Sequence, residues 1–329
     1  MADQLYIAPA GASQSRTRVL PGPSENVSHL LKPIDGGPPR QPKAEYLPVD
    51  EVEWVIEVTW KNESPRNARD VAKLFRNTPW NTLGTKTEFG KNFATGRWTY
   101  LVSGNGPTDV KALRIAWPYF ADWDSAAPEP TPDLFTKRLE AVRSAVAGWE
   151  GVVVKSEIPV PAAAARAVDL RALHQRFSSE IVLRIKAPFL RKYDGRSIWD
   201  VLLCLGLEWG DMDCFHWRND SGVGADHHFS VWTSTPPGYF LPEQIAAKKL
   251  KAADLIFGFS IPRSINPAAV LDRMYAAAKY SQSRLGGRMV DASDEAFDLN
   301  ASIEKIRIAA NELTSRGFPP GSPAAMRFF

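Results

Sequence analysis

The sequence predicts an α+β fold made of two tandem units, each an antiparallel sheet with helices packed on one face. Runs rich in aromatic and β-branched residues, separated by Gly, Asp, Asn and Pro-Pro-Gly, indicate the strands. Helical patterns of apolar residues flank such runs at residues 196–206 and 267–285. Strands and helices in this order favour a split βαβ, ferredoxin-like unit.

The composition is that of an ordinary globular protein. Of 329 residues, 44% are hydrophobic and 23% are charged. The net charge of +3 is too small to indicate a nucleic-acid partner by itself. Cys204 and Cys214 cannot form a disulfide framework, and no run approaches the roughly 18 apolar residues of a membrane span. Without a secretory signal at its start, the chain is expected to be cytoplasmic.

A Pro/Gly-rich arm is expected over residues 1–48, because this composition cannot supply a hydrophobic core. The arm is predicted to be flexible. The alternative is an arm that docks on a neighbouring chain through Leu30, Leu31 and Ile34.

The first α+β unit is expected over residues 49–158. Its first strand alternates strictly, with apolar residues at the even positions from 52 to 60, which indicates one buried face. Helices are predicted at residues 67–77 and 132–148, and further strands at 97–103, 112–118 and 151–156. The open face would carry Glu53, Glu57, Arg97 and Arg114, whose mixed charges favour cross-strand ion pairs over ligand binding.

A connecting helix at residues 159–177 precedes the second α+β unit, expected over residues 178–316, and a tail follows at 317–329. Strands are predicted at residues 180–187, 208–217, 227–234, 254–261 and 288–291, and helices at 196–206, 267–285 and 299–315. Both units have the order strand–helix–strand–strand–helix–strand, with one extra strand in the second. This repeated order predicts an internal duplication of a split βαβ unit.

Four segments of the second unit carry a family resemblance: GLEWGDMDCFHW (206–217), HHFSVW with the later PPGYFLPE (227–243), DLIFGFSIP (254–262) and SRLGGRMVD (283–291). Through them, residues 180–315 resemble the C-terminal FtsZ-binding domain of the bacterial cell-division protein ZipA. The resemblance implies an antiparallel sheet backed by helices. It also implies a shallow apolar groove on the exposed sheet face, which receives the C-terminal tail of the tubulin-like FtsZ, and no catalysis. The membrane anchor and long linker of that family are not expected in this chain.

The partner-binding residues are expected on the sheet face away from the helices. Alternation turns Leu183 and Ile185 inward and leaves the even-numbered residues of that strand open. The same alternation applies to the strands at 227–234 and 254–261, and the resemblance adds three residues of the strand at 208–217. The expected set is Val182, Arg184, Lys186, Met212, Cys214, His216, Trp232 and Ile256.

Exposed apolar residues clustered in this way mark a partner site, and Trp is a common anchor. Arg184 and Lys186 at one side would suit a peptide with acidic residues. Two alternatives remain open. In the first, Trp232 itself would fill the groove. In the second, the chain's own first unit, arm or tail would cover the face.

No metal site is predicted around His216, His227 and His228. Asp211 and Asp213 are near in sequence, but along one strand they would point away from His216. No catalytic motif or phosphate-binding loop is present either, so no cofactor or small-molecule substrate is expected.

Nucleic-acid binding is not expected. Trp54, Trp60, Trp98 and Tyr100 are placed together on the apolar, core-facing side of the first sheet, where they cannot stack on bases. Glu57 on the opposite face would repel phosphates.

The sequence therefore predicts a non-enzymatic adaptor. It would dock a peptide segment of a protein partner, either an FtsZ-like tail or a component of another bacterial assembly, on the second sheet. The alternative is a structural subunit of a multiprotein assembly whose N-terminal arm and C-terminal tail dock on neighbouring chains.

Overall fold

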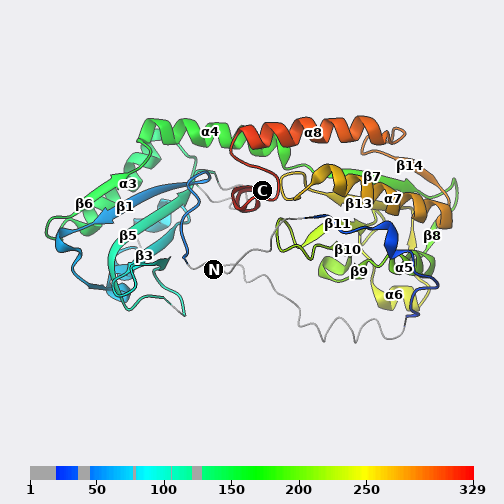
Figure 1. Ribbon diagram of the computed structural model, residues 1–329, viewed down its shortest axis with the longest axis horizontal. Helices are drawn as coiled ribbons and strands as arrows, with labels where there is room; N and C mark the ends of the chain where they lie inside the picture. Colours follow the sequence, from blue (N-terminus) through cyan, green and yellow to red (C-terminus); the bar gives the residue numbers. More distant parts are fainter. Residues whose placement is uncertain (1–19, 36–44, 77–78, 105, 121–127) are drawn as a thin grey trace. The chain divides into compact units, whose positions relative to one another are not determined.

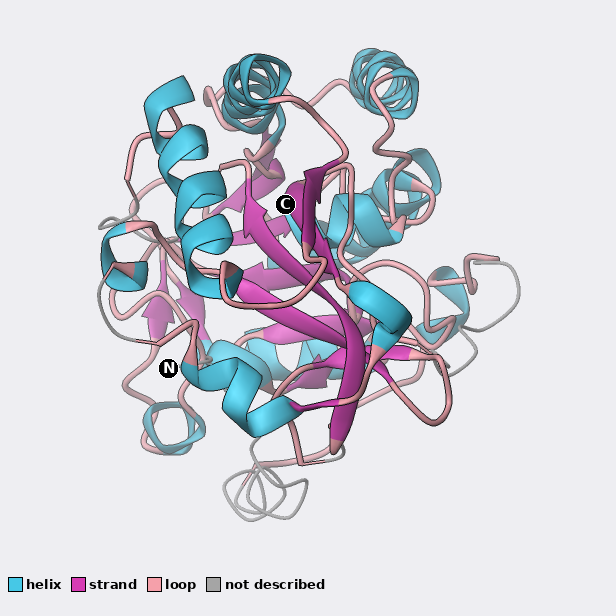
Figure 2. Ribbon diagram, turned by 90° about the vertical axis from the view of Figure 1, so that its left-hand side faces the viewer, coloured by secondary structure: helices cyan, strands magenta, loops and turns pink. Residues whose placement is uncertain are grey.

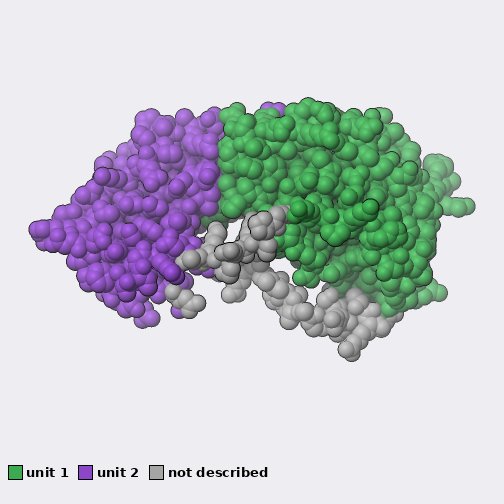
Figure 3. Space-filling view, in the orientation of Figure 1, with its two compact units in different colours: residues 1–40, 177–327, 329 green, residues 41–176, 328 purple. Residues whose placement is uncertain are grey.

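The computed structural model describes residues 20–35, 45–76, 79–104, 106–120 and 128–329. The chain forms two compact units (Figure 3). Unit 1 comprises residues 1–40, 177–327 and 329, and unit 2 comprises residues 41–176 and 328. Both contain antiparallel sheets with helices, so the predicted α+β class is confirmed. Figure 1 labels the elements, and Figure 2 distinguishes strands from helices by colour.

Unit 2 is organised on a sheet with the strand order β4-β3-β5-β1-β6, in which β2 also pairs with β5. The strands are β1 (Glu53–Thr59), β2 (Arg66–Asn67), β3 (Thr87–Asn92), β4 (Trp98–Tyr100), β5 (Asp109–Pro118) and β6 (Val153–Ser156). The helices are α2 (Ala68–Lys73), α3 (Pro132–Val146) and α4 (Val160–Phe177). Sequence reasoning missed β3, because Phe89 is its only large apolar residue and alternation is therefore not visible.

The alternation predicted for β1 is confirmed on its core-facing side. Trp54 is fully buried and meets Phe135 of α3 edge-on, with ring centroids 5.0 Å apart. Its register partner on β5, Trp117, is fully buried as well. The large rings of β1 and β5 thus fill the space beneath α3.

The placement of Trp98 and Tyr100 on that core face was wrong. Tyr100 pairs with Phe89, Phe89 pairs with Arg114, and Arg114 pairs with Glu57. Residues in register share a face, so the rings lie on the side opposite Trp54. Their orientation follows from the hairpin with β3, the strand that the sequence did not reveal.

Unit 1 is organised on a sheet with the order β14-β7-β13-β11-β10-β9, in which all neighbours are antiparallel. The strands are β7 (Ile181–Lys186), β9 (Glu208–Trp209), β10 (Phe215–Arg218), β11 (His227–Trp232), β13 (Asp254–Phe259) and β14 (Arg288–Val290). A small second sheet pairs β8 (Tyr193–Asp194) with β12 (Lys251–Ala252). The helices are α5 (Gly195–Cys204), α6 (Pro242–Ala246), α7 (Pro267–Leu285), α8 (Leu299–Ser315) and α9 (Pro323–Phe328). A short 3-10 turn, η1 (Ser28–Leu30), belongs to the arm.

The bounds of α7 and α8 agree with the prediction, because both helices have clear end signals. The side chain of Asn266 accepts a hydrogen bond from the amide of Ala269, and Pro267 occupies the first turn. At the other end Gly286 has a φ of +76°, a conformation in which glycine avoids the steric cost of a side chain.

The predicted continuous strand at 208–217 was wrong. A 3-10 turn, η4 (Asp211–Asp213), separates β9 from β10. Met212 and Asp213 have φ values of +55° and +54°, in the left-handed region that no strand can accommodate. Aromatic content signalled a strand here, but the Gly-Asp-Met-Asp segment forms a turn.

The core of unit 1 lies between the sheet and the helices α5 and α7. Leu183, Ile185, Val231 and Phe257 are fully buried on the helix-facing side, as alternation predicted. Phe215 of β10 also faces inward and meets Trp199 of α5 at 4.9 Å between ring centroids. No helix within the described ranges is long and apolar enough to cross a membrane.

Candidate functional site

Strand register places six of the eight expected residues on the sheet face opposite α5 and α7, with His216 joined to the others through its pairing with Ser230. Trp232 pairs with Ile256, and Ile256 pairs with Arg184. In the next row, Gly258 pairs with Val182. Paired residues share a face, so these side chains form one surface, called here the open face: Val182, Arg184, Lys186, His216, Ser230, Trp232, Ile256 and Gly258.

The indole of Trp232 lies directly over Gly258. A Cβ atom at Gly258 would be 2.4 Å from Cη2 and 2.9 Å from Cζ3 of that ring, closer than real contacts allow. Glycine is therefore required beneath the indole, as at other places of close approach in strands. Ile256 beside it is only 5% exposed. In this conformation Trp232 itself occupies the space above the centre of the sheet.

The basic side of the open face is neutralised within the chain. Nζ of Lys186 is 2.7 Å from Oδ2 of Asp294, and Nη1 of Arg184 is 3.7 Å from Oδ1 of the same residue. The hydrogen bond from Lys186 lowers the pKa of Asp294. Arg184 also lies 3.5 Å from Oδ2 of Asp254. An acidic peptide would have to compete with these carboxylates, which sequence reasoning missed because they are distant along the chain.

Asp254 is a buried polar anchor at the edge of the open face. Its side chain is 5% exposed and accepts hydrogen bonds from the hydroxyls of Thr233 and Ser234, at 3.0 and 2.6 Å. The backbone amide of Ser234 donates a third, at 2.8 Å. These bonds join the end of β11 to the start of β13. The available signal was an aspartate directly before the apolar run LIFGF.

His216 is buried on the open face and has both ring nitrogens bonded. Nε2 is 2.8 Å from the carbonyl oxygen of Asp211, and Nδ1 is 2.8 Å from Oγ of Ser230. A carbonyl oxygen only accepts, so Nε2 carries the proton and Ser230 donates to Nδ1. Burial lowers the pKa of His216, which favours this neutral form. Its ring stacks on His227 with centroids 4.1 Å apart.

A β-bulge separates His228 from the other two histidines. The register shifts between Trp217 and Arg218, and His228 packs against the Trp217 ring at 4.3 Å. Burial lowers the pKa of His228 to about 4. Within the described ranges, no group of three or more His, Cys, Asp or Glu side chains is arranged to hold a metal ion.

Met212 and Cys214 lie outside the paired strands of the open face. Met212, in the η4 turn, is 77% exposed. Cys214 follows that turn and donates from its thiol to the carbonyl oxygen of Met212 at 3.4 Å. Burial raises the pKa of Cys214 to about 11, so the thiol is not a reactive thiolate at neutral pH.

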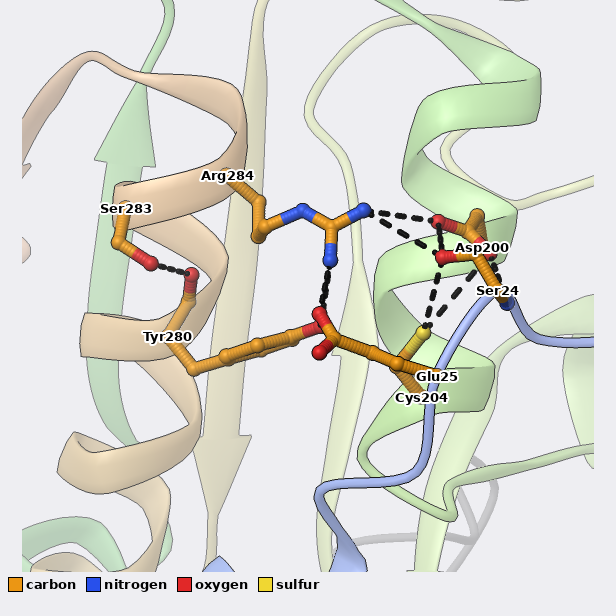
Figure 4. Close-up of polar contacts among 7 residues, drawn as sticks. All are labelled: Ser24, Glu25, Asp200, Cys204, Tyr280, Ser283 and Arg284. Carbon is orange, nitrogen blue, oxygen red and sulfur yellow. Dashed lines mark hydrogen bonds and ion pairs between the residues drawn. The ribbon is translucent and has the colours of Figure 1, made fainter.

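The described part of the arm, residues 20–35, contacts the helices of unit 1. Figure 4 shows Ser24 and Glu25 beside α5 and α7. The backbone nitrogen and hydroxyl of Ser24 donate to the carboxylate of Asp200, at 2.6 and 2.7 Å. Arg284 donates to both Glu25 and Asp200, and the Tyr280 hydroxyl donates to Glu25 at 2.8 Å. These contacts are on the helix side of the unit.

Two further contacts complete this arm-binding surface. The backbone amide of Val27 donates to the carbonyl oxygen of Cys204 at 2.8 Å. Leu31, one of the three residues expected to anchor the arm, is only 6% exposed, whereas Leu30 and Ile34 are half-buried. These contacts are made within this chain, and docking of the arm on a neighbouring chain stays a prediction. Arm residues 1–19 and 36–44 lie outside the described residues.

Comparison with known proteins gives a match for the second half of the chain. Residues 179–308 match the family model of the ZipA, C-terminal FtsZ-binding domain. The cell division protein ZipA of Actinobacillus succinogenes is 31% identical over 121 residues, which cover 37% of this chain and 35% of that protein. ZipA of Marinobacter nauticus is 27% identical over 111 residues, or 34% of this chain and 32% of that protein. ZipA of Colwellia psychrerythraea is 23% identical over 185 residues, or 56% of this chain and 47% of that protein.

The resemblance indicated by the sequence is thus confirmed, and unit 1 contains a domain that is similar to the C-terminal domain of ZipA. The chain spans about a third of the length of the first two of these relatives.

Proposed function

We propose that the ZipA-like domain of this chain is a non-enzymatic protein-binding module that docks a peptide segment of its partner on the open face. The FtsZ C-terminal tail is the partner that the family description favours, because that family is described as FtsZ-binding. The observation that carries the proposal is the row formed by Trp232, Ile256 and Arg184, flanked by Val182, on the face that α5 and α7 do not cover.

The chemistry of the open face favours apolar contacts over charge pairing. Arg184 and Lys186 already have carboxylate partners, whereas Trp232 and Val182 are half-buried apolar side chains with part of their surface still free. Burying apolar surface is the main source of affinity at such sites. We therefore expect Trp232 to turn away from Gly258 and pack against apolar side chains of the peptide.

The test is the affinity of a fluorescently labelled peptide from the C-terminus of FtsZ of the same organism, measured by anisotropy. Trp232→Ala should weaken binding by about thirtyfold, the loss typical of an anchoring Trp. Ile308→Ala is the matched control, because Ile308 is a 57% exposed apolar residue on α8, on the helix side. It should leave affinity unchanged.

Equal affinity of the wild type and Trp232→Ala would contradict the proposal. Tighter binding by Trp232→Ala would show instead that the indole competes with the peptide for the space over Gly258, and Trp232 would then be a plug and not an anchor. Thermal midpoints of all three proteins should be compared first, so that a folding defect is not mistaken for lost binding.

The second candidate function is a structural subunit that exchanges its arm with a neighbouring chain. The contacts that favour it are those of Ser24 and Glu25 with Asp200 and Arg284, since the same surface would accept the arm of a second copy. Light scattering distinguishes the two functions. A dimer that dissociates on Arg284→Ala supports arm exchange, and a monomer at all concentrations excludes it.

A further inference from the structure

The loop between β7 and β8 exposes two adjacent large apolar side chains. Phe189 is 91% exposed and Leu190 is 90% exposed, the highest values among the large hydrophobic residues of the described ranges. Isolated apolar residues are common on protein surfaces, but two neighbours that make almost no contact with their own domain are not.

The exposure is built into an ordered turn. The amide of Arg191 donates to the carbonyl oxygen of Pro188 at 2.9 Å, which closes a four-residue turn with Phe189 and Leu190 at its centre. Leu190 has a φ of +61°, where a glycine would be less strained. The turn therefore places a leucine at a position whose backbone conformation favours glycine, the residue without a side chain.

Both ends of the loop are anchored to the domain. Before the turn, the amide of Ala187 donates to the carbonyl oxygen of Ala253 at 2.9 Å. After it, Tyr193 is buried and its hydroxyl donates to the carbonyl oxygen of Gly286 at 2.8 Å. The apolar pair is thus held at a fixed place on unit 1.

Basic residues lie beside this apolar tip. Residues 186–192 contain no acidic residue and three basic ones: Lys186, Arg191 and Lys192. A fourth basic residue, Arg288, lines a shallow groove together with Lys186, Pro188 and Phe189.

Part of this charge is available to a ligand. Lys186 has an ion-pair partner, Asp294. Arg191 and Lys192 are exposed, and neither has an ion-pair partner within the described ranges. The two directly follow Leu190 along the chain.

We propose that this tip, defined by Phe189 and Leu190 with the adjacent basic residues, binds the surface of an anionic lipid bilayer. The two apolar side chains enter the boundary between headgroups and acyl chains, and the lysines and arginines attract the anionic headgroups. A protruding apolar pair with cations beside it is complementary to a flat anionic surface, whereas a peptide groove requires a concave one. The tip and the open face share only Lys186, so either proposal can fail without the other.

The experiment is co-sedimentation of the full chain with vesicles of phosphatidylcholine alone and of phosphatidylcholine with phosphatidylglycerol. The wild type should sediment only with the anionic vesicles. The double variant Phe189→Ser, Leu190→Ser should reduce the bound fraction at equal lipid by about tenfold or more, because both inserting side chains are lost. Arg191→Glu with Lys192→Glu should have a comparable effect and should also weaken the dependence on phosphatidylglycerol.

Ile308→Ser is the matched control, an exposed apolar residue on α8 that should leave sedimentation unchanged. Since Phe189 and Leu190 make almost no contacts, the double variant should keep the wild-type thermal midpoint. Excess inorganic phosphate at constant ionic strength should not release the protein, which separates a bilayer from a free phosphate as the ligand.

Three results would overturn the proposal. In the first, the wild type stays in the supernatant with anionic vesicles. In the second, the double variant binds these vesicles as well as the wild type does. In the third, vesicles are not bound, and light scattering shows a self-association that the double variant abolishes. The tip would then be a contact between copies of this chain.

Discussion

In both units an arginine lies near a carboxylate on the sheet face away from the helices, but the carboxylate is partly exposed in unit 2 and buried in unit 1. In unit 2, Glu57 of β1 and Arg114 of β5 form an ion pair at 2.7 Å, and the Arg114 guanidinium lies 4.8 Å from the centre of the Trp98 ring. In unit 1, Arg184 lies near two acidic residues, of which Asp254 is 3.5 Å away and buried. One sheet has a hydrated ion pair and the other a desolvated carboxylate.

The surroundings of each carboxylate explain the difference. The side chain of Glu57 is 33% exposed and water can solvate it, so its pairing with Arg114 adds little to stability. Asp254 receives three hydrogen bonds from Thr233 and Ser234, which replace the lost water. We therefore expect the carboxylate to contribute little to stability where it is exposed and more where it holds a buried hydrogen-bond network. The cross-strand ion pair expected on the first sheet is confirmed by Glu57 and Arg114.

The largest expected effect tests this contrast. Asp254→Ala should lower the free energy of unfolding of unit 1 by about 3 kcal/mol, because it leaves the buried hydroxyl of Thr233 without its acceptor and removes two hydrogen bonds from Ser234. Glu57→Ala should lower that of unit 2 by less than about 1 kcal/mol. Urea denaturation followed by circular dichroism measures both. Equal losses of unfolding free energy in the two variants would show that the buried Asp254 contributes no more to stability than the exposed Glu57.

The β-bulges of the two sheets give the second contrast. The bulge in unit 2, between Lys91 and Asn92, lies opposite Lys111, which pairs with Glu63 at 3.3 Å. The bulge in unit 1 buries the imidazole of His228, and burial lowers the pKa of His228 to about 4, with Asp220 a weaker opposing influence.

The unfolded chain therefore binds a proton that the native state does not between about pH 6.5 and pH 4, and stability falls as the pH falls through that window. We expect a loss of about 2 kcal/mol in unit 1 from this histidine. His228→Phe keeps the contact with Trp217 and should flatten the pH dependence of the urea midpoint. His29→Phe, at an exposed position of the arm, is the control and should not. An unchanged slope in His228→Phe would assign the pH dependence to other groups.

The smallest expected effect tests the close packing of Trp232. Gly258→Ala puts a methyl group 2.4 Å from the indole and forces the ring to move, which should cost between about 1 and 2 kcal/mol of unfolding free energy. Gly148→Ala, where no atom lies within 4 Å of the new methyl group, should cost nothing or stabilise slightly. If Gly258→Ala is also neutral, Trp232 is mobile over the sheet, and the open face is accessible without displacing it.

Local sequence predicted the α+β class, the bounds of α7 and α8 and the inward residues of β7, because periodicity and end signals are short-range properties. It also placed Val182, Arg184, Trp232 and Ile256 on one face, since alternation has a period of two. The internal duplication of the two units remains a prediction from element order. Binding of a partner by the open face remains a proposal.

Only the tertiary structure decided the state of that face. Asp294 reaches Lys186 across 108 residues of sequence, and the indole of Trp232 covers a glycine of the neighbouring strand. Strand register also determines the orientation of Trp98 and the separation of His228 from His216. The turn at Met212 depends on a positive φ that the sequence did not indicate. Periodicity determines which side of a strand a residue occupies, whereas strand pairing and loop closure determine what it contacts there, and that requires the positions of distant residues in space.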